Sequence, residues 1–303
     1  MKWNNIVTYL MLLVLMVGCN NPPEKEREPT KVTKYLIEAE ELLPIVTDDT
    51  LVVLDLQRPE DFQKGHVKNS INIWRSELNN PSFKYDGMIP DRDFLGEKLR
   101  SKGVPANAFI VLYDNRGSCE ATRLWWVLKH YGYERMAILN GGIQGWMKLD
   151  TLTTEIVNRK RSDFELPSYV GTNTSLNMLI GDLSMMVNNN EPFMLDTRSK
   201  DEFEGLSLKQ GAKWAGRIPE SKHIDWMEAV DQETFRFKET SELQKIYNEV
   251  INNEQLVVTY CHSGVRSTHT FFVLTELLGR KNVKNYDGSW VEWTHHFQPE
   301  LVN

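Results

Sequence analysis

The chain has 303 residues, of which 42 are acidic and 35 are basic, and its formal net charge is −7 at pH 7. This balance argues against nucleic acid as a partner, because phosphates attract basic surfaces and the chain has no basic run or stripe of stacking aromatic residues. The length suffices for two ordinary domains with separate cores. The chain contains 3 cysteines, too few to predict a disulfide framework.

The first residues predict an export signal. Lys2 precedes an apolar run from Ile6 to Val17, which is shorter than the roughly 20 apolar residues that cross a bilayer. Residues 16–19, Met-Val-Gly-Cys, resemble the bacterial lipobox. This resemblance implies that residues 1–18 are removed and that Cys19 carries a lipid. The alternative is an ordinary secretory signal in which the cysteine is incidental.

A polar segment follows the predicted signal. Residues 19–34 are rich in charge and contain prolines, a composition typical of a solvated tether. Cleavage leaves a mature chain of 285 residues (303 minus 18). We therefore expect a protein of the cell envelope, attached through its N-terminal lipid to a bacterial membrane on the extracytoplasmic side.

An internal repeat divides the rest of the chain. A constant shift of 147 residues (258 minus 111) aligns the two halves without a gap over one long stretch. The aligned pairs are Val111 with Val258, Tyr113 with Tyr260, Asp114 with Cys261, Gly117 with Gly264, Gly132 with Gly279, Gly141 with Gly288 and Trp146 with Trp293. The repeat predicts two domains, residues 35–150 and 175–303, joined by a linker over residues 151–174.

Each half predicts alternating strands and helices. The expected elements are strands at 51–54 and 109–113, a helix at 121–131, strands at 193–195 and 256–260, and a helix at 267–278. Uninterrupted apolar strands are typical of a buried parallel sheet, and a glycine after each helix fits a C-terminal cap. The predicted fold class is α/β, with two tandem domains that each hold a parallel sheet flanked by helices. Such sheets bind ligands at the carboxyl ends of their strands.

The segment 257–268, Val-Val-Thr-Tyr-Cys-His-Ser-Gly-Val-Arg-Ser-Thr, predicts a strand, a tight loop headed by Cys261 and a helix. The loop amides have no helical partners, the helix start adds partial positive charge, and Arg266 adds a full charge. We therefore expect the Cys261 thiol to ionise near neutral pH. The alternative is a buried cysteine that serves only packing.

The order strand, Cys-x-x-Gly-x-Arg-Ser/Thr, helix resembles the active loop of the rhodanese-like sulfurtransferases, and the tandem halves resemble the two-domain members of that family. The resemblance implies that Cys261 carries a transferable sulfur atom as a persulfide. The loop that would hold this anion consists of His262, Ser263, Gly264, Val265 and Arg266. His262 and Ser263 either set the preference for an acceptor or contribute only their backbone. Cysteine phosphatases have five residues between Cys and Arg, whereas four stand here, so a smaller cradle is expected and phosphatase activity is the alternative.

Arg198 follows the predicted strand 193–195, where we expect it beside the active loop. It either binds an anionic donor or pairs with a neighbouring carboxylate for structure. Some two-domain rhodaneses have a second arginine four residues later, where this chain has Glu202, so the resemblance does not fix the natural donor. Residues 286–293 resemble the closing signature of the catalytic half and are expected to pack behind the loop, with Trp290 at the entrance.

The first half aligns as an inactive copy. Asp114 stands at the position of the nucleophile, and a carboxylate cannot carry a persulfide. We expect this half to shape the cleft and to supply groups such as Arg116 across it. Cys119 aligns with Arg266, five places beyond the nucleophile, and is expected to be a quiet free thiol at the start of a helix.

Together these features predict a sulfurtransferase that moves sulfane sulfur from a small donor, such as thiosulfate or mercaptopyruvate, to a thiol or cyanide acceptor. No metal or organic cofactor is implied, and a monomer is expected. One alternative is a non-enzymatic persulfide-binding or sulfur-relay protein that serves a membrane partner. A thiol-based reductase is a further alternative, and it would require Cys119 to approach Cys261 across the two domains.

Overall fold

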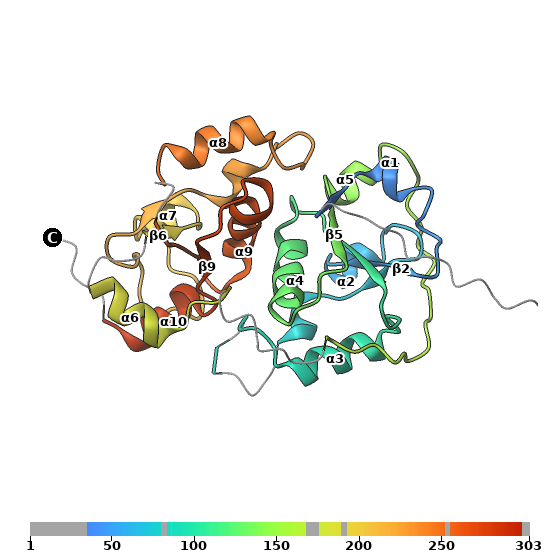
Figure 1. Ribbon diagram of the computed structural model, residues 1–303, viewed down its shortest axis with the longest axis horizontal. Helices are drawn as coiled ribbons and strands as arrows, with labels where there is room; N and C mark the ends of the chain where they lie inside the picture. Colours follow the sequence, from blue (N-terminus) through green and yellow to red (C-terminus); the bar gives the residue numbers. More distant parts are fainter. Residues whose placement is uncertain are drawn as a thin grey trace, which may run out of the picture.

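The computed structural model describes residues 35–79, 84–85, 87–167, 176–188, 193–251 and 255–298. Two α/β domains lie side by side, the N-terminal one in blue to green and the C-terminal one in yellow to red (Figure 1). The predicted signal, lipidated cysteine and tether lie outside the described residues. Within the described part of the chain, no helix is both long and apolar enough to cross a membrane.

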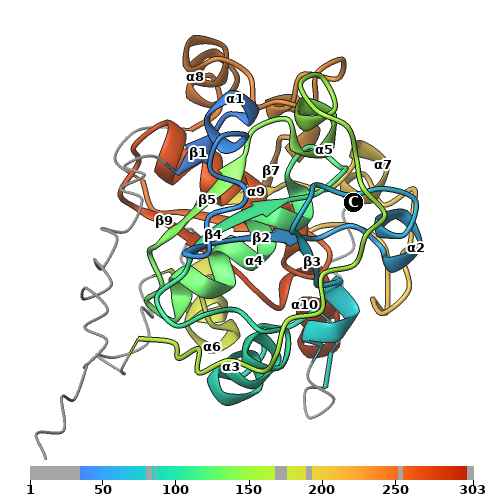
Figure 2. The same ribbon diagram turned by 90° about the vertical axis from the view of Figure 1, so that its right-hand side faces the viewer.

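The N-terminal domain is built on a five-stranded sheet in the order β1-β5-β4-β2-β3, with every pair parallel. Figure 2, which faces this domain, shows these strands crossing it side by side. Its elements are β1 (Leu36–Ile37), α1 (Ala39–Leu42), β2 (Leu51–Asp55), α2 (Pro59–Phe62), β3 (Ile71–Asn72), η1 (Arg75–Leu78), α3 (Arg92–Ser101), β4 (Phe109–Tyr113), α4 (Cys119–His130), β5 (Met136–Leu139) and α5 (Gly142–Trp146).

The C-terminal domain repeats this plan with a four-stranded parallel sheet in the order β7-β6-β8-β9. Its elements are α6 (Ile180–Asn188), β6 (Phe193–Asp196), α7 (Lys200–Phe203), β7 (Lys222–His223), η2 (Trp226–Ala229), α8 (Thr240–Asn248), β8 (Val257–Tyr260), α9 (Val265–Phe272), the π-helical turn η3 (Val273–Leu277), β9 (Val283–Asn285) and α10 (Ser289–His296).

The predicted fold class is confirmed, because each domain places its most apolar strands at the centre of a parallel sheet. All residues of β2, β4 and β8 are buried. Helices cover both faces, so these strands meet apolar side chains above and below. Gly132 and Gly279 follow the two long helical segments with φ angles of 79° and 69°, a left-handed conformation that glycine adopts without strain.

The two domains join through α4 and α9, which lie against each other at the centre of the molecule (Figure 1). Trp125 and Phe272 meet edge to face there, with ring centroids 4.8 Å apart. The buried Arg123 on α4 donates to Asp287 of the other domain at 2.6 Å. Apolar side chains of both domains form one continuous cluster across this contact, so burial of apolar surface holds the domains together.

A buried histidine makes this contact sensitive to acid. The Nε2 of His269 on α9 lies 3.1 Å from the carbonyl oxygen of Gly117 in the other domain, and burial lowers the pKa of His269 from an ordinary 6.5 to about 3. A lowered pKa means that the unfolded chain binds the proton more tightly, so the stability from this residue is present above pH 6.5 and is lost as the pH falls toward 3.

We predict that His269 contributes a loss of about 2 kcal/mol in unfolding free energy between about pH 7 and about pH 5. Denaturant unfolding at both pH values measures this loss, and His269→Gln should reduce it. His296→Gln, at an exposed position, is the control and should lose as much stability as the natural chain. An equal loss in all three proteins would show that His269 does not carry the effect.

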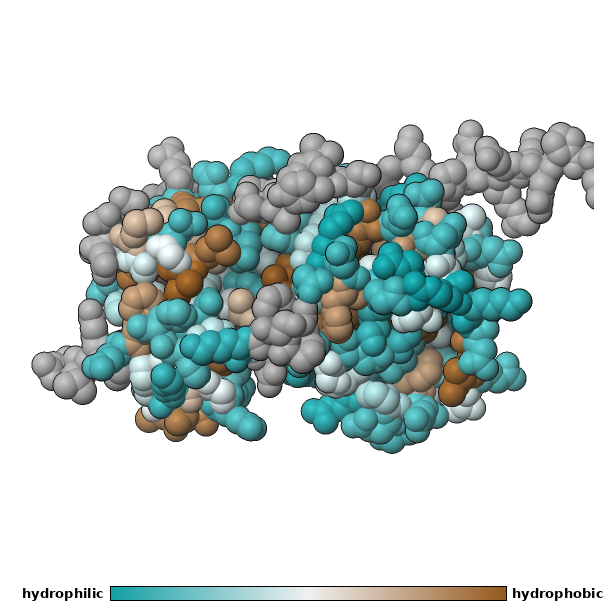
Figure 3. Space-filling view, turned by 90° about the horizontal axis from the view of Figure 1, so that it is seen from below, coloured by the Kyte–Doolittle hydropathy of each residue, from teal (hydrophilic) through white to brown (hydrophobic). Residues whose placement is uncertain are grey.

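Seen from below, the domains form two rounded halves, and hydrophilic side chains predominate on the half that belongs to the N-terminal domain (Figure 3). The larger exposed apolar side chains come from separate segments, among them Ile156, Met185 and Leu206. Single exposed apolar residues are normal on a protein surface, so their exposure alone does not indicate a binding site.

Candidate active site

The loop after β8 has the tight conformation that the sequence predicts. β8 ends at Tyr260, and α9 begins at Val265 with Gly264 as its N-terminal cap residue. Gly264 has a φ of 77°, and a Cβ atom there would lie 2.8 Å from the carbonyl oxygen of Asp287. A larger residue at this position would be strained and would collide with backbone, so the glycine allows the chain to turn from Cys261 into the helix.

The segment behind the loop fixes its position. The hydroxyl of Ser289 accepts hydrogen bonds from the backbone amides of Cys261 and Gly264, each at 3.1 Å. The amide of Trp290 donates to the carbonyl of Cys261 at 3.0 Å. The expectation that residues 286–293 pack behind the loop is therefore confirmed. Ser289 was missed as a functional residue, because a serine in a helical segment gives no signal of what its hydroxyl contacts.

The environment of Cys261 favours a thiolate. Burial of the side chain, which is 1% exposed, raises its pKa, but the charge of Arg266 and hydrogen bonds from Ser267 and the backbone of Ser263 outweigh burial. The net result is a Cys261 pKa below its ordinary value. A depressed pKa is typical of a reactive cysteine, whereas a cysteine that serves only packing has its pKa raised by burial.

Arg266 is held in place by the carboxylate of Glu202, a role that the sequence did not predict. Its guanidinium donates to both oxygens of Glu202, at 2.6 and 2.9 Å, and Lys209 lies 2.9 Å from the same carboxylate. Burial raises the pKa of Glu202, but its bonds to Arg266 and Lys209 outweigh burial and bring it well below its usual range. Glu202 is therefore ionised and orients Arg266 toward the loop.

Cys261 faces a cavity of about 390 Å³ that residues of both domains line, named here the inner cavity. The C-terminal domain contributes Cys261, His262, Ser263, Val265 and Arg266, together with Glu202, Lys209, Asp225 and Trp226. The N-terminal domain contributes Arg75, Arg116 and Cys119. Arg116 thus lies across the cleft as expected, and Arg75 is a lining cation that sequence alone did not identify.

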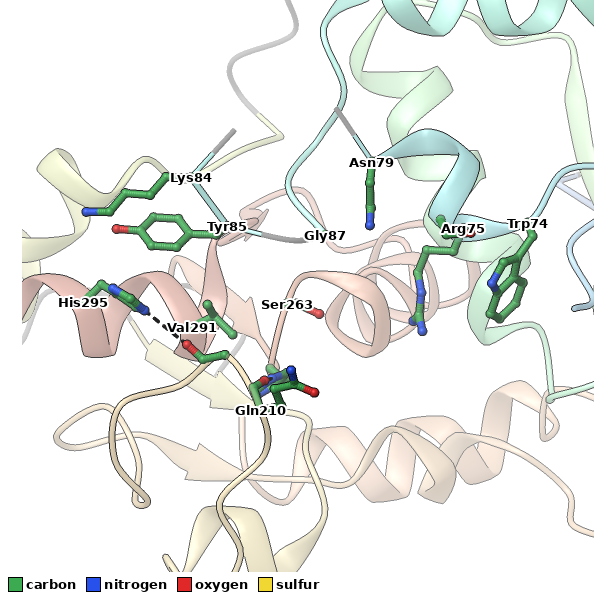
Figure 4. A pocket seen from close by; sticks show the side chains of 13 residues that line it. Trp74, Arg75, Asn79, Lys84, Tyr85, Gly87, Gln210, Ser263, Val291 and His295 are labelled. Carbon is green, nitrogen blue, oxygen red and sulfur yellow. Dashed lines mark hydrogen bonds between the residues drawn. The ribbon is translucent and has the colours of Figure 1, made fainter. Parts of the chain in front are cut away.

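A larger cavity of about 680 Å³, named here the outer cavity, adjoins the inner one and shares Arg75, His262 and Ser263 with it. Figure 4 shows its aromatic and cationic lining, with Trp74 and Arg75 on one side and Tyr85, Lys84 and His295 on the other. The guanidinium of Arg75 lies 5.3 Å from the ring centre of Trp74, a cation–π arrangement. The residues shared by the two cavities place the outer cavity next to the one that Cys261 lines.

His262 and Ser263, for which both a role in acceptor preference and a purely backbone role were considered, line both cavities. The Nε2 of His262 lies 2.9 Å from the carbonyl oxygen of Gln210, which orients the ring along the wall. Ser263 lies near the centre of Figure 4, between Tyr85 and Arg75, and lines both cavities. Both side chains are partly exposed, so they are placed to touch a bound molecule.

Arg198 requires a correction, because the structure does not place it as an anion ligand. Its side chain is 1% exposed, and its Nε donates to both oxygens of Asp196, at 2.9 and 3.0 Å. It also stacks against Trp290, 4.9 Å from the ring centre, and neither residue is among those described as lining the two cavities. The structural alternative for Arg198 is therefore the right one, and Trp290 packs behind the loop instead of lining the entrance.

The equivalent loop of the N-terminal domain binds a carboxylate that belongs to the chain itself. The carboxylate of Asp114, at the position equivalent to Cys261, accepts hydrogen bonds from four backbone amides. The donors are Arg116 at 2.8 Å, Ser118 at 2.9 Å, Glu120 at 2.6 Å and Ala121 at 3.0 Å. An anion that belongs to the chain thus fills the first loop, whereas the equivalent loop around Cys261 opens on a cavity.

Comparisons with known proteins agree with this geometry. A family model described as Rhodanese-like domain matches residues 38–149 and 180–296. SseA of Mycobacterium bovis, which carries a thiosulfate sulfurtransferase assignment, is 31% identical over 274 residues, covering 86% of this chain and 85% of that protein. SseA of Mycobacterium leprae, with the same assignment, is 32% identical over 260 residues, covering 83% and 82%.

Solved structures show the same two-domain fold. Tum1 from Saccharomyces cerevisiae superimposes with a TM-score of 0.77 at 20% identity, covering 88% of this chain and 96% of that one. SseA from Escherichia coli, described among the 3-mercaptopyruvate sulfotransferases, superimposes with a TM-score of 0.73 at 23% identity, covering 85% and 99%. The matching family model, the relatives above 30% identity and the confirmed loop all point the same way, and the chain belongs to the rhodanese family as a sulfurtransferase with two rhodanese-like domains.

Proposed function

We propose that Cys261 is the sulfur carrier of this enzyme and that thiosulfate or a mercapto acid such as mercaptopyruvate is its donor. The observation that carries this proposal is the position of Cys261, whose pKa is lowered by Arg266, at the head of an open loop with the same design as the anion-filled loop around Asp114. A thiolate that is stabilised by backbone hydrogen bonds from Ser263 and Ser267 is suited both to attack a donor and to hold the resulting anion.

With thiosulfate, the Cys261 thiolate attacks the outer sulfur atom, the S–S bond of the donor breaks, and sulfite leaves with the bonding electron pair. The product is a Cys261 persulfide anion, which faces the loop amides as the thiolate did. In the second half of the reaction, an acceptor thiol or cyanide attacks the outer sulfur and restores the Cys261 thiolate. Donor and acceptor meet the same atom in turn, so ping-pong kinetics are expected.

The inner cavity has groups that suit an anionic donor. Arg75, Arg116 and Lys209 line it with side chains that are 39%, 52% and 48% exposed. Arg75 and Arg116 both pair with the buried Glu120, which holds them at the cavity wall. These cations are placed to attract a dianion such as thiosulfate, while Arg266 is committed to Glu202 and to the Cys261 loop.

The direct test of this proposal is the mass of the peptide that contains Cys261. Full-length protein is treated with thiosulfate, and separately with mercaptopyruvate, and is then alkylated and digested. We expect one added sulfur atom on the Cys261 peptide and its loss when cyanide is added. A Cys261 peptide that gains no sulfur from any donor, while Cys119 or another residue does, would overturn the assignment of Cys261.

A second candidate is a sulfur-relay protein that delivers the persulfide to a partner and turns over small molecules slowly. The observation that favours it is Glu202, which neutralises Arg266 where a second cation would otherwise strengthen the binding of a small donor. Rapid steady-state formation of thiocyanate supports the enzyme. A persulfide that forms in full but reaches cyanide slowly supports the relay.

The proposed location depends on Cys19. We propose that this residue is lipidated and holds the domains outside the cytoplasmic membrane. The sequence Met-Val-Gly-Cys at the end of the apolar run supports this proposal. In a bacterial host, the natural chain should sediment with membranes and Cys19→Ser should appear in the soluble or unprocessed fraction. Metabolic labelling with a fatty acid checks the modification. Fatty-acid label that persists in Cys19→Ser, or a natural chain that takes up no label, would contradict this proposal.

A further inference from the structure

The inner cavity holds a second thiol that the sequence alignment assigned no role. Cys119 is the first residue of α4 in the N-terminal domain, and it lines the same cavity of about 390 Å³ as Cys261. Both are free thiols, and both are almost entirely shielded from bulk solvent, with exposures of 0% and 1%. Thiols of both domains therefore line one cavity, as a reaction between them across the domain boundary requires.

The packing of the two domains explains how these residues come together. α4 and α9 lie against each other, and the first turns of both helices meet at the inner cavity. Cys119 belongs to a small apolar cluster that contains Val265, the first residue of α9, together with Trp226 and Val230 of the C-terminal domain. Side chains of the C-terminal domain therefore hold Cys119 in place. Cys261 belongs to the same domain and lies four residues before Val265 in the sequence.

The two thiols differ in their electrostatic environment. The pKa of Cys119 is raised well above its ordinary value, chiefly by burial and then by Glu120, although the charge of Arg266 acts on Cys119 as well. The pKa of Cys261 is lowered, because Arg266 and nearby hydrogen bonds outweigh its burial. The environment therefore favours the thiolate at Cys261 and the protonated thiol at Cys119.

We propose that Cys119 is a resolving thiol, which attacks the inner sulfur of the Cys261 persulfide when no acceptor is bound and closes a disulfide between the two domains. This inference rests on the proposed function, since it begins from the persulfide. The Cys119–Cys261 bond forms, the bond between the inner and outer sulfur breaks, and the proton of the Cys119 thiol leaves on the outer sulfur as hydrosulfide. Formally, the outer sulfur gains one electron and the Cys119 sulfur loses one, while the Cys261 sulfur is already at the disulfide level, so no outside oxidant or reductant is required.

This reaction gives the enzyme a second outlet for sulfur. A bound acceptor takes the outer sulfur and leaves the Cys261 thiolate ready for another donor. Without an acceptor, the enzyme instead releases one hydrosulfide and stops, because the disulfide occupies the sulfur carrier. A dithiol reductant restores both thiols by disulfide exchange. The disulfide requires the two Cα atoms to come within roughly 7 Å, so the first turns of α4 and α9 must be able to reach that separation.

The test follows the fate of a preloaded persulfide. Full-length natural protein, Cys119→Ser and Cys119→Ala are loaded with thiosulfate, freed of donor and incubated without acceptor. Samples are then alkylated and mapped as peptides without reduction, and released sulfide is measured. Cys119→Ala keeps an apolar side chain in the cluster if serine disturbs it. Val230→Ala, which loosens the same cluster and leaves both thiols in place, is the matched packing control.

We expect the natural chain and Val230→Ala to lose the persulfide, to release one sulfide per molecule and to yield a peptide that joins Cys119 to Cys261. Both Cys119 variants should keep the persulfide at least tenfold longer and should still transfer sulfur when cyanide is added. Equal persulfide lifetimes in the natural chain and the Cys119 variants, or sulfide release without the joined peptide, would overturn the inference while leaving Cys261 as the sulfur carrier.

A second measurement separates this inference from the proposed function. Diamide oxidises neighbouring thiols without any sulfur donor, and it should join Cys119 to Cys261 in the natural chain. If no persulfide forms but diamide joins the two residues, the proposed sulfur carrier is wrong, and the resolving step falls with it, although the thiol pair remains. If the persulfide forms and diamide fails to join them, the resolving role of Cys119 is overturned by itself.

Discussion

Replacement of the Cys261 thiol by a hydroxyl, Cys261→Ser, should lower sulfur transfer from thiosulfate to cyanide by roughly 10⁴-fold. The serine hydroxyl fits the same loop, but it is not ionised near neutral pH and cannot carry a sulfane sulfur. Steady-state formation of thiocyanate measures the loss. The protein should remain folded, because the side chain is buried in a loop that the hydroxyl of Ser289 and the backbone amide of Trp290 hold independently of the sulfur atom.

The matched control for this substitution is Cys19→Ser, which makes the same chemical change far from the inner cavity in the sequence. Purified Cys19→Ser protein should transfer sulfur at the natural rate. Thermal unfolding of both variants checks that neither has lost its fold. A Cys261→Ser protein that unfolds normally and retains a tenth or more of the natural rate would contradict a covalent role for Cys261.

The second large effect concerns the ion pair between Arg266 and Glu202, which two substitutions break from opposite sides. Arg266→Gln removes the charge that lowers the Cys261 pKa, so burial dominates and the pKa of the thiol rises. Transfer at neutral pH should fall by roughly 10²-fold and should recover in part as the pH increases and the thiolate forms. The rate of alkylation of Cys261 as a function of pH measures this shift directly.

Glu202→Gln is the matched variant, because it breaks the same pair but leaves the guanidinium beside the thiol. Its Cys261 pKa should stay low. Glu202→Gln should lose about 3 kcal/mol of unfolding free energy, because it leaves the Arg266 guanidinium, which is 13% exposed, without its carboxylate. Arg266→Gln should lose less, because Lys209 remains paired with the Glu202 carboxylate. If Arg266→Gln and Glu202→Gln shift the Cys261 pKa equally, the effect comes from altered packing and not from the charge of Arg266.

The contrast between the two loops supports the proposal that only the C-terminal half carries sulfur. Asp114 satisfies the amides of the first loop with its own carboxylate, so that loop is complete without a ligand. The side chain of Cys261 ends in one ionisable sulfur, and its loop opens on the inner cavity. The repeat thus keeps one copy as scaffold, and its Arg75, Arg116 and Cys119 become part of the wall of the other copy's site.

Local patterns were sufficient for the elements that carry the site. The apolar runs at 109–113 and 257–260 are buried strands, and the predicted helices at 121–131 and 267–278 differ from the observed elements mainly at their ends. The second helix ends differently, because α9 passes into the π-helical turn η3. Hydrogen bonding near a helix end depends on the packing of its neighbours, which sequence periodicity does not describe.

The sequence by itself determined the strand-to-loop geometry around Cys261, the doubled α/β fold and the inert carboxylate at Asp114, because each depends on residues close together in the chain or on their spacing. Only the tertiary structure decided between equal alternatives for Arg198 and revealed the partnership of Glu202 with Arg266, since side-chain contacts depend on which strand ends lie side by side. It alone placed Cys119 at the inner cavity. A repeat alignment superimposes equivalent positions but contains no information on how two copies face each other, and burial of the apolar faces of α4 and α9 sets that arrangement.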